Sequence, residues 1–150
     1  MLRNILNGEE HLIINDPVRP HIPFEDRVGK GREIFVLEND ESKQIDAVIC
    51  VAYTTEVPTS EYDLELFAQQ ACQDGQHGDI AVFYTVWSYS KGAGRTIVNQ
   101  SAQFIKENRP VTRFVTLSPL TEMARKFHLS NGARFVAKHY DCQNFEYDLV

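Results

Sequence analysis

The sequence is short of cysteine, carries fewer basic than acidic side chains and has no long apolar run. Its three cysteines are too few and too scattered for a disulfide framework or a CxxC metal site. A formal net charge of −6 disfavours nucleic acid or an anionic membrane as the main partner. No apolar stretch reaches the length of a membrane span or of a signal-peptide core. We therefore expect a cytoplasmic protein.

The remaining composition is typical of a globular domain. Hydrophobic residues make up 43% of the 150 residues and charged residues 24%. Cys50 lies inside an apolar run, so we expect it in the core as a small hydrophobic residue. This length and balance predict a single domain over residues 1–150.

Hydrophobic periodicity predicts an α/β fold with a mixed sheet. Apolar or alternating runs bounded by turn residues indicate strands at 33–38, 45–54, 80–87, 113–117 and 133–139, and a weaker run at 12–14 could add an edge strand. Apolar residues at helical spacing indicate helices at 61–72 and 96–108, and a third that ends at Asn131–Gly132. The early strands are expected to be antiparallel, and a strand, loop, helix and strand order then predicts a parallel crossover.

The loop of that crossover is the most informative stretch of the chain. A buried strand runs through a glycine-containing turn into a helix, which predicts an anion cradle of backbone N–H groups at the helix start. Its residues are Ser90, Lys91, Gly92, Ala93, Gly94 and Arg95. The two cations could add charge-assisted bonds to a phosphate. The alternative is a tight turn with two solvated cations.

Two motifs resemble the GNAT (acyl-CoA N-acyltransferase) superfamily. Residues 89–94 resemble its pyrophosphate loop, Q/R-x-x-G-x-G/A, with Tyr89 at the first position. Residues 124–133 stand where the superfamily has an alanine-rich helix with a tyrosine and then a glycine, and His128 takes the place of that tyrosine. The resemblance implies a GNAT-like fold that holds coenzyme A or an acyl-CoA on the loop 90–95, with no metal.

Three further strings resemble one branch of that superfamily, the catalytic domain of malonyl-CoA decarboxylase. They are VAYTTEVPTS at 51–60, VTLSP at 115–119 and FHLSNGA at 127–133, and the resemblance is strongest over residues 32–139. The family's N-terminal helical domain has no counterpart here, and its long segment between the last two strings is shortened to one helix. The resemblance implies that Ser118 and His128 are the catalytic pair acting on a malonyl-type thioester.

The chemistry of these residue types fits that reaction. A serine hydroxyl can stabilise an enolate oxygen, and a histidine can hold the carboxylate or supply the proton that carbon needs. The alternatives are that Ser118 is a helix N-cap and His128 a packing residue. Asn131 is a candidate substrate contact or simply a helix stop. The adjacent residues 139–141 do not form a metal site, because successive strand residues point to opposite faces.

Three other functions remain open. An N-acyltransferase would use His128 as the acid, with Glu38 or Glu56 as weak candidates for the base. A non-catalytic acyl-CoA sensor needs only the loop. A DNA-binding module could be drawn over 121–139 as helix, glycine turn and helix. We expect acyl-CoA as the partner, with no nucleic acid and no membrane, and leave a homodimer open.

Overall fold

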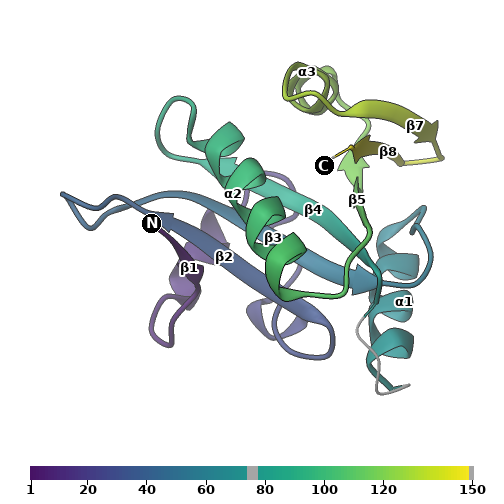
Figure 1. Ribbon diagram of the computed structural model, residues 1–150, viewed down its shortest axis with the longest axis horizontal. Coiled ribbons are helices and arrows are strands. Elements are labelled where there is room, and N and C mark those ends of the chain that lie inside the picture. The colour runs from purple at the N-terminus through teal and green to yellow at the C-terminus, as the bar shows by residue number, and fades with distance from the viewer. Residues whose placement is uncertain (74–77, 149–150) are drawn as a thin grey trace.

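Eight strands form one mixed sheet with helices on both faces (Figure 1). The computed structural model describes residues 1–73 and 78–148. The strands are β1 (Leu2–Asn4), β2 (Arg32–Glu38), β3 (Ile45–Thr54), β4 (Ile80–Ser88), β5 (Arg113–Thr116), β6 (Ser118–Pro119), β7 (Arg134–Lys138) and β8 (Cys142–Tyr147). The α-helices are α1 (Glu61–Gln73), α2 (Ala93–Asn108) and α3 (Glu122–Ser130), and short 3-10 helices cover Glu10–Asn15 and Phe24–Asp26.

The strand order is β1-β2-β3-β4-β5-β8-β6, with β7 paired to β8. Strands β1 to β4 are antiparallel neighbours, and β4 pairs with β5 in parallel. Helix α2 makes the crossover between β4 and β5. The mixed α/β sheet and the parallel crossover predicted from the sequence are therefore confirmed.

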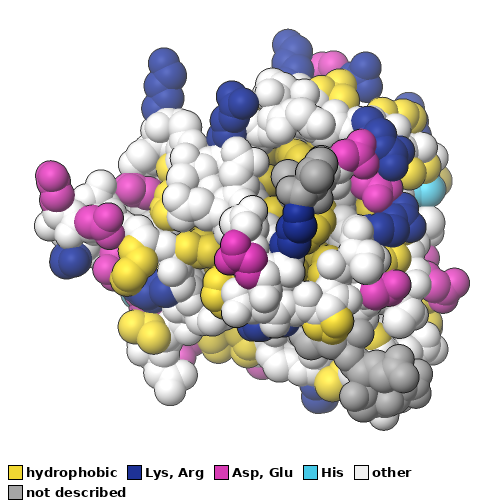
Figure 2. Space-filling view, in the orientation of Figure 1, with side chains coloured by type: hydrophobic (Ala, Val, Ile, Leu, Met, Phe, Trp, Pro, Cys, Tyr) yellow, Lys and Arg dark blue, Asp and Glu magenta, His cyan; other side chains and the backbone are white. Residues whose placement is uncertain are grey.

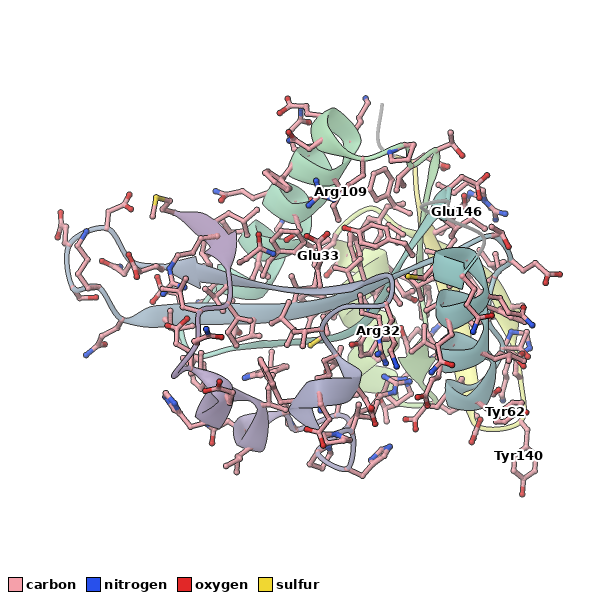
Figure 3. The ribbon with its side chains drawn as sticks, turned by 90° about the horizontal axis from the view of Figure 1, so that it is seen from below. Arg32, Glu33, Tyr62, Arg109, Tyr140 and Glu146 are labelled. Carbon is pink, nitrogen blue, oxygen red and sulfur yellow. The ribbon has the colours of Figure 1, made fainter. Side chains whose placement is uncertain are left out.

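Each face of the sheet has its own core. On one face α2 buries Ile97, Val98 and Ile105 against side chains of β2, β3 and β4. On the other face α1 and the N-terminal segment bury Leu64, Ala68 and their neighbours. Cys50 is fully buried there, as predicted. The C-terminal end of α2 is tied to β2 by an Arg109–Glu33 ion pair of 2.7 Å, which Figure 3 shows beneath that helix.

Two predictions about strands are wrong, although the strand expected at 133–139 exists as β7. Residues 12–14 are not an edge strand but part of a 3-10 helix, because Leu12 and Ile13 both turn into the core beneath the sheet. The strand predicted at 133–139 is also not the last one, since β8 follows it and pairs with β5, β6 and β7. The polar residues of β8 made it look like loop in the sequence. They are nevertheless buried, and each has a polar partner: Asn144 donates to the Thr116 carbonyl at 2.8 Å, and Glu146 forms an ion pair with Arg113 at 2.8 Å.

Strand β4 pairs with β5 along only its first half. Only Ile80–Phe83 pairs with β5, while the rest of β4 continues beside β3 alone. At this point two adjacent residues of β3, Cys50 and Val51, pair with Thr85 and Phe83 of β4. Tyr84 is left as the extra residue of a β-bulge. The buried guanidinium of Arg19 donates to the Tyr84 carbonyl and so satisfies it. The second half of β4, which has no partner strand on the β5 side, forms a wall of the site described next.

Candidate active site

A cleft of about 320 Å³ lies where β4 and β5 diverge. The unpaired half of β4, the start of α2, strand β6 and helix α3 surround it, and the loop residues Pro17 and Val18 complete one side. Three residues singled out in the sequence meet in it, namely Gly94, Ser118 and His128. The described residues that line the cleft include no Asp, Glu, Lys or Arg. His128 is therefore the titratable group that matters most there.

His128 is held from behind by a tyrosine. Helix α3 places the imidazole between the rings of Phe127 and Phe145, with centroids at 5.1 and 5.4 Å, and only 6% of the residue is exposed. Its Nδ1 lies 2.8 Å from the Tyr147 hydroxyl of β8. Burial lowers the pKa of His128 to about 4, so the ring is neutral near pH 7.

Ser118 is a buried strand residue rather than a helix cap. It lies in β6, and its hydroxyl donates to Thr116 Oγ1 at 2.8 Å. Thr121 caps α3 instead, accepting the Ala124 N–H at 3.2 Å, so the alternative interpretation of Ser118 as an N-cap is wrong. Among the hydrogen bonds of the described residues, none joins Ser118 to His128. The two side chains therefore line the same cleft without contacting each other through a hydrogen bond.

The glycines of the crossover loop have distinct roles. Gly92 precedes α2 with φ of 82°, a left-handed conformation that favours glycine. A Cβ on Gly94 would stand 3.1 Å from Cε1 of Phe127, so glycine lets the start of α2 approach α3 across the cleft. The helix begins at Ala93, three residues earlier than predicted, and has no side-chain cap. The Ala93 N–H bonds the Ser90 carbonyl at 3.1 Å, and the N–H groups of Gly94 and Arg95 are available to an anion.

Charged groups around the loop are mixed in sign. Lys91 and Arg95 are exposed, and Figure 2 shows Lys and Arg side chains standing above the end of the molecule that carries this loop and α3. Asp46 of β3 also contacts the loop, and no motif or spacing in the sequence indicated it. Its carboxylate accepts the Ser90 hydroxyl at 3.0 Å and its carbonyl accepts the Tyr89 N–H at 2.7 Å. The Asp46 carboxylate thus holds the loop in place, and its negative charge would repel a phosphate bound there.

Asn131 stands outside the cleft lining. It follows α3, and its backbone N–H bonds to the last carbonyls of the helix. The left-handed residue of this helix stop is Gly132, with φ of 95°, and not Asn131, with φ of −86°. The Asn131 side chain opposes the effect of burial on the pKa of the Tyr147 hydroxyl, and its buried amide nitrogen has no hydrogen-bond partner among the described residues. The structure therefore puts Asn131 next to the partner of His128.

The described residues contain neither a metal-ligand cluster nor a membrane-spanning helix. No group of three or more His, Cys, Asp or Glu side chains in that part of the chain could hold a metal ion. No helix there combines the length and apolar character that crossing a membrane requires. The DNA-binding alternative also loses its second helix, because 134–138 form the strand β7.

Comparison with solved structures shows a GNAT-like fold. Malonyl-CoA decarboxylase from Agrobacterium vitis is similar with a TM-score of 0.63 and 20% identity, over 85% of this chain and 35% of that one. The N-acetyltransferase PseH from Campylobacter jejuni has a TM-score of 0.60 and 15% identity, over 98% of this chain and 96% of that one. The chain thus spans about a third of the length of the decarboxylases that it resembles. No protein-family pattern and no curated protein sequence matches it.

Two other similar structures contain a bound partner. AtaTR was solved with acetyl-CoA bound; it matches 98% of this chain and 92% of its own, at 9% identity and a TM-score of 0.62. KacTA was solved in complex with DNA; it matches 98% of this chain and 91% of its own, at 10% identity and a TM-score of 0.63. These ligands belong to those proteins. The fold class is that of acyl-CoA N-acyltransferases, as the resemblance implied.

Proposed function

We propose that this chain is an acyl-CoA-binding enzyme that decarboxylates a malonyl-type thioester. The observation that carries the proposal is a cleft lined by two neutral polar side chains, Ser118 and His128, with no charged side chain among its described lining residues. His128 can donate a hydrogen bond to a ligand there, and Ser118 can do so once its hydroxyl rotates away from Thr116. Such a cleft suits a reaction whose transition state gathers negative charge on one oxygen. It suits poorly a reaction that needs a strong base.

The pose follows from the position of the cleft. The pyrophosphate of coenzyme A would rest on the loop 90–95 and the first turn of α2. Gly94 belongs both to that turn and to the cleft wall, so the thiol arm can pass beside it toward Ser118 and His128. The apolar walls from Val86, Trp87 and Phe127 would exclude water around the thioester.

The reaction then needs two things from the chain. Loss of CO2 breaks the bond between the carboxyl carbon and C2, and its electron pair moves onto the thioester oxygen as an enolate. Neutral donors placed at that oxygen stabilise it without a prior protonation. The enolate is quenched by a proton at C2, which a donor nitrogen of His128 can supply before regaining one from solvent.

An N-acyltransferase is the second candidate, favoured by the nearly full coverage of the N-acetyltransferase PseH. That reaction requires a base for the amine. Neither Glu38 nor Glu56 lines the cleft, and Glu38 is paired with Arg3 at 3.0 Å. A His128 with a pKa of about 4 is a weak base as well. The chemistry of the lining therefore favours decarboxylation over transfer.

The test is turnover of malonyl-CoA without an amine. Wild type should release CO2 and acetyl-CoA, while Ser118→Ala and His128→Gln should each lower kcat by about 10²-fold, the scale of losing one such donor. Ser42→Ala, an exposed turn serine, is the matched control. Turnover only with an added amine would make the chain a transferase, and tight binding without turnover a sensor. Absence of binding to CoA, acetyl-CoA and malonyl-CoA would overturn the proposal.

A further inference from the structure

Tyr147 is buried next to His128 and outside the cleft lining. Only 3% of the tyrosine is exposed, and its hydroxyl lies 2.8 Å from His128 Nδ1. A neutral imidazole has one donor and one acceptor nitrogen, so whatever Nδ1 does with Tyr147 decides what Nε2 presents to the cleft. The question is which of the two residues donates.

The surroundings of Tyr147 settle the direction of that bond. Burial raises the pKa of the hydroxyl far above neutrality, so it keeps its proton. Among the described residues, the hydrogen bond of this hydroxyl is the one with His128 Nδ1. If Nδ1 donated in that bond, the buried hydroxyl proton would have no acceptor among the described residues, which is costly. Tyr147 is therefore the donor and His128 Nδ1 the acceptor.

We propose that Tyr147 is a positioning residue that fixes His128 as the neutral tautomer with its proton on Nε2. The ring then presents a donor to the cleft, which the enolate oxygen of the proposed reaction requires. The opposite tautomer would present a lone pair to the cleft, which repels that oxygen. This inference rests on the proposed function for its purpose, but the tautomer itself can be measured without any substrate.

Nitrogen-15 NMR of the labelled protein at pH 7 measures it. The chain has five histidines, and the spectrum of His128→Gln identifies the signals of His128. Wild type should show a proton on Nε2 and none on Nδ1. Tyr147→Phe removes one hydrogen bond of ordinary strength and should lower the ratio of the two tautomers about five-fold. Tyr53→Phe, which alters a buried tyrosine bonded to Glu33, should leave the His128 signals unchanged.

Kinetics supply the second readout. Tyr147→Phe should lower kcat about five-fold with KM unchanged, because the donor acts in the transition state. The wild-type spectrum alone decides the tautomer if Tyr147→Phe does not fold. A wild-type His128 protonated on Nδ1 would overturn the inference, as would a tautomer ratio unmoved in Tyr147→Phe. If wild type has the predicted tautomer but does not turn over malonyl-CoA, only the proposed function is contradicted.

Discussion

At the scale of single residues, His128 makes stability depend on pH. Its pKa of about 4 in the folded protein is below the value of 6.5 expected in the unfolded chain. Above pH 6.5 both states are neutral there and the group contributes nothing. As the pH falls toward 4, only the unfolded state takes up the proton, so stability is lost, by about 2 kcal/mol between pH 7 and pH 5.

Urea unfolding at pH 7 and pH 5 measures this loss. Carboxylates also titrate in this range, so the comparison is between wild type and His128→Gln, which should lack this part of the pH dependence. His11→Gln, an exposed histidine, is the control and should behave as wild type. Equal pH dependence in wild type and His128→Gln would contradict a buried neutral ring.

Two glycines near the loop should respond differently to substitution. Gly92→Ala introduces a Cβ with free space around it at a left-handed residue, so it should cost about 1 kcal/mol of stability. Gly94→Leu instead fills the wall opposite Phe127, and it should weaken acyl-CoA binding at least about ten-fold by blocking a preformed site. Calorimetric titration and urea unfolding of both variants separate the effects. Normal binding by Gly94→Leu would mean that the ligand enters elsewhere.

The residues found from sequence share a feature that the missed ones lack. Ser118 and His128 lie in short strings that resemble a known family, and Gly94 lies in a loop motif. Asp46 and Tyr147 act through contacts that span 44 and 19 positions of the chain, and neither belongs to such a string. Their contacts depend on how segments far apart in the sequence pack together, and local sequence patterns carry no information about that packing.

At the scale of elements, a buried ion pair organises the proline-rich N-terminal segment, which one of its members ties to β4. The side chains of Asp16 and Arg27, both in this segment, are fully buried and 2.7 Å apart, and Asp16 also accepts the Thr85 hydroxyl of β4 at 2.9 Å. This segment forms one side of the cleft through Pro17 and Val18. The sequence predicted it only as loop, because polar contacts of this kind leave no periodic pattern.

Arg27→Met should therefore destabilise the protein strongly. It leaves the Asp16 carboxylate buried without its cation, which costs about 3–5 kcal/mol. Arg125→Met removes an exposed arginine of α3 and should change stability by less than about 0.5 kcal/mol. Chemical denaturation of both variants makes the comparison. A loss below about 1 kcal/mol in Arg27→Met would show that water reaches the pair.

The elements with a clear hydrophobic period were predictable, and β8 was not. Strands β2, β3 and β4 and helices α1 and α2 were found within a few residues of their bounds. In β8 the sequence CQNFEY contains three polar side chains that are buried because β5, β6 and the loops supply partners for them. Polarity normally indicates exposure. A strand whose polar groups are satisfied inside the protein defeats that rule.

At the scale of the whole molecule, the cleft separates two halves of the sheet. Strands β1 to β4 lie on one side and β5 to β8 with α3 on the other, and β4 and β5 share four residue pairs (Figure 1). A ligand in the cleft contacts both halves. At 100 times its Kd it should add about 2.7 kcal/mol to stability, which for this size raises Tm by about 5–10 °C.

Thermal unfolding with and without coenzyme A measures this shift. Gly94→Leu, with its cleft blocked, should show almost none. An equal shift in wild type and in this variant would place the ligand outside the cleft. The same titration can be repeated with acetyl-CoA and malonyl-CoA to rank the acyl groups.

The bulge at Tyr84 makes the cleft depend on a count of residues rather than on their identity. Phe83 faces the α2 core, Tyr84 the opposite core, and after the extra residue Val86 and Trp87 resume the alternation in shifted phase. Substitutions in this strand preserve that phase whatever their chemistry. Removing Tyr84 itself would make Thr85 and Phe83 consecutive, so the following side chains would keep their β3 partners and their faces. A single-codon deletion at the bulge would therefore leave the other side chains of the wall in place and still remove the bend in β4 that the bulge introduces.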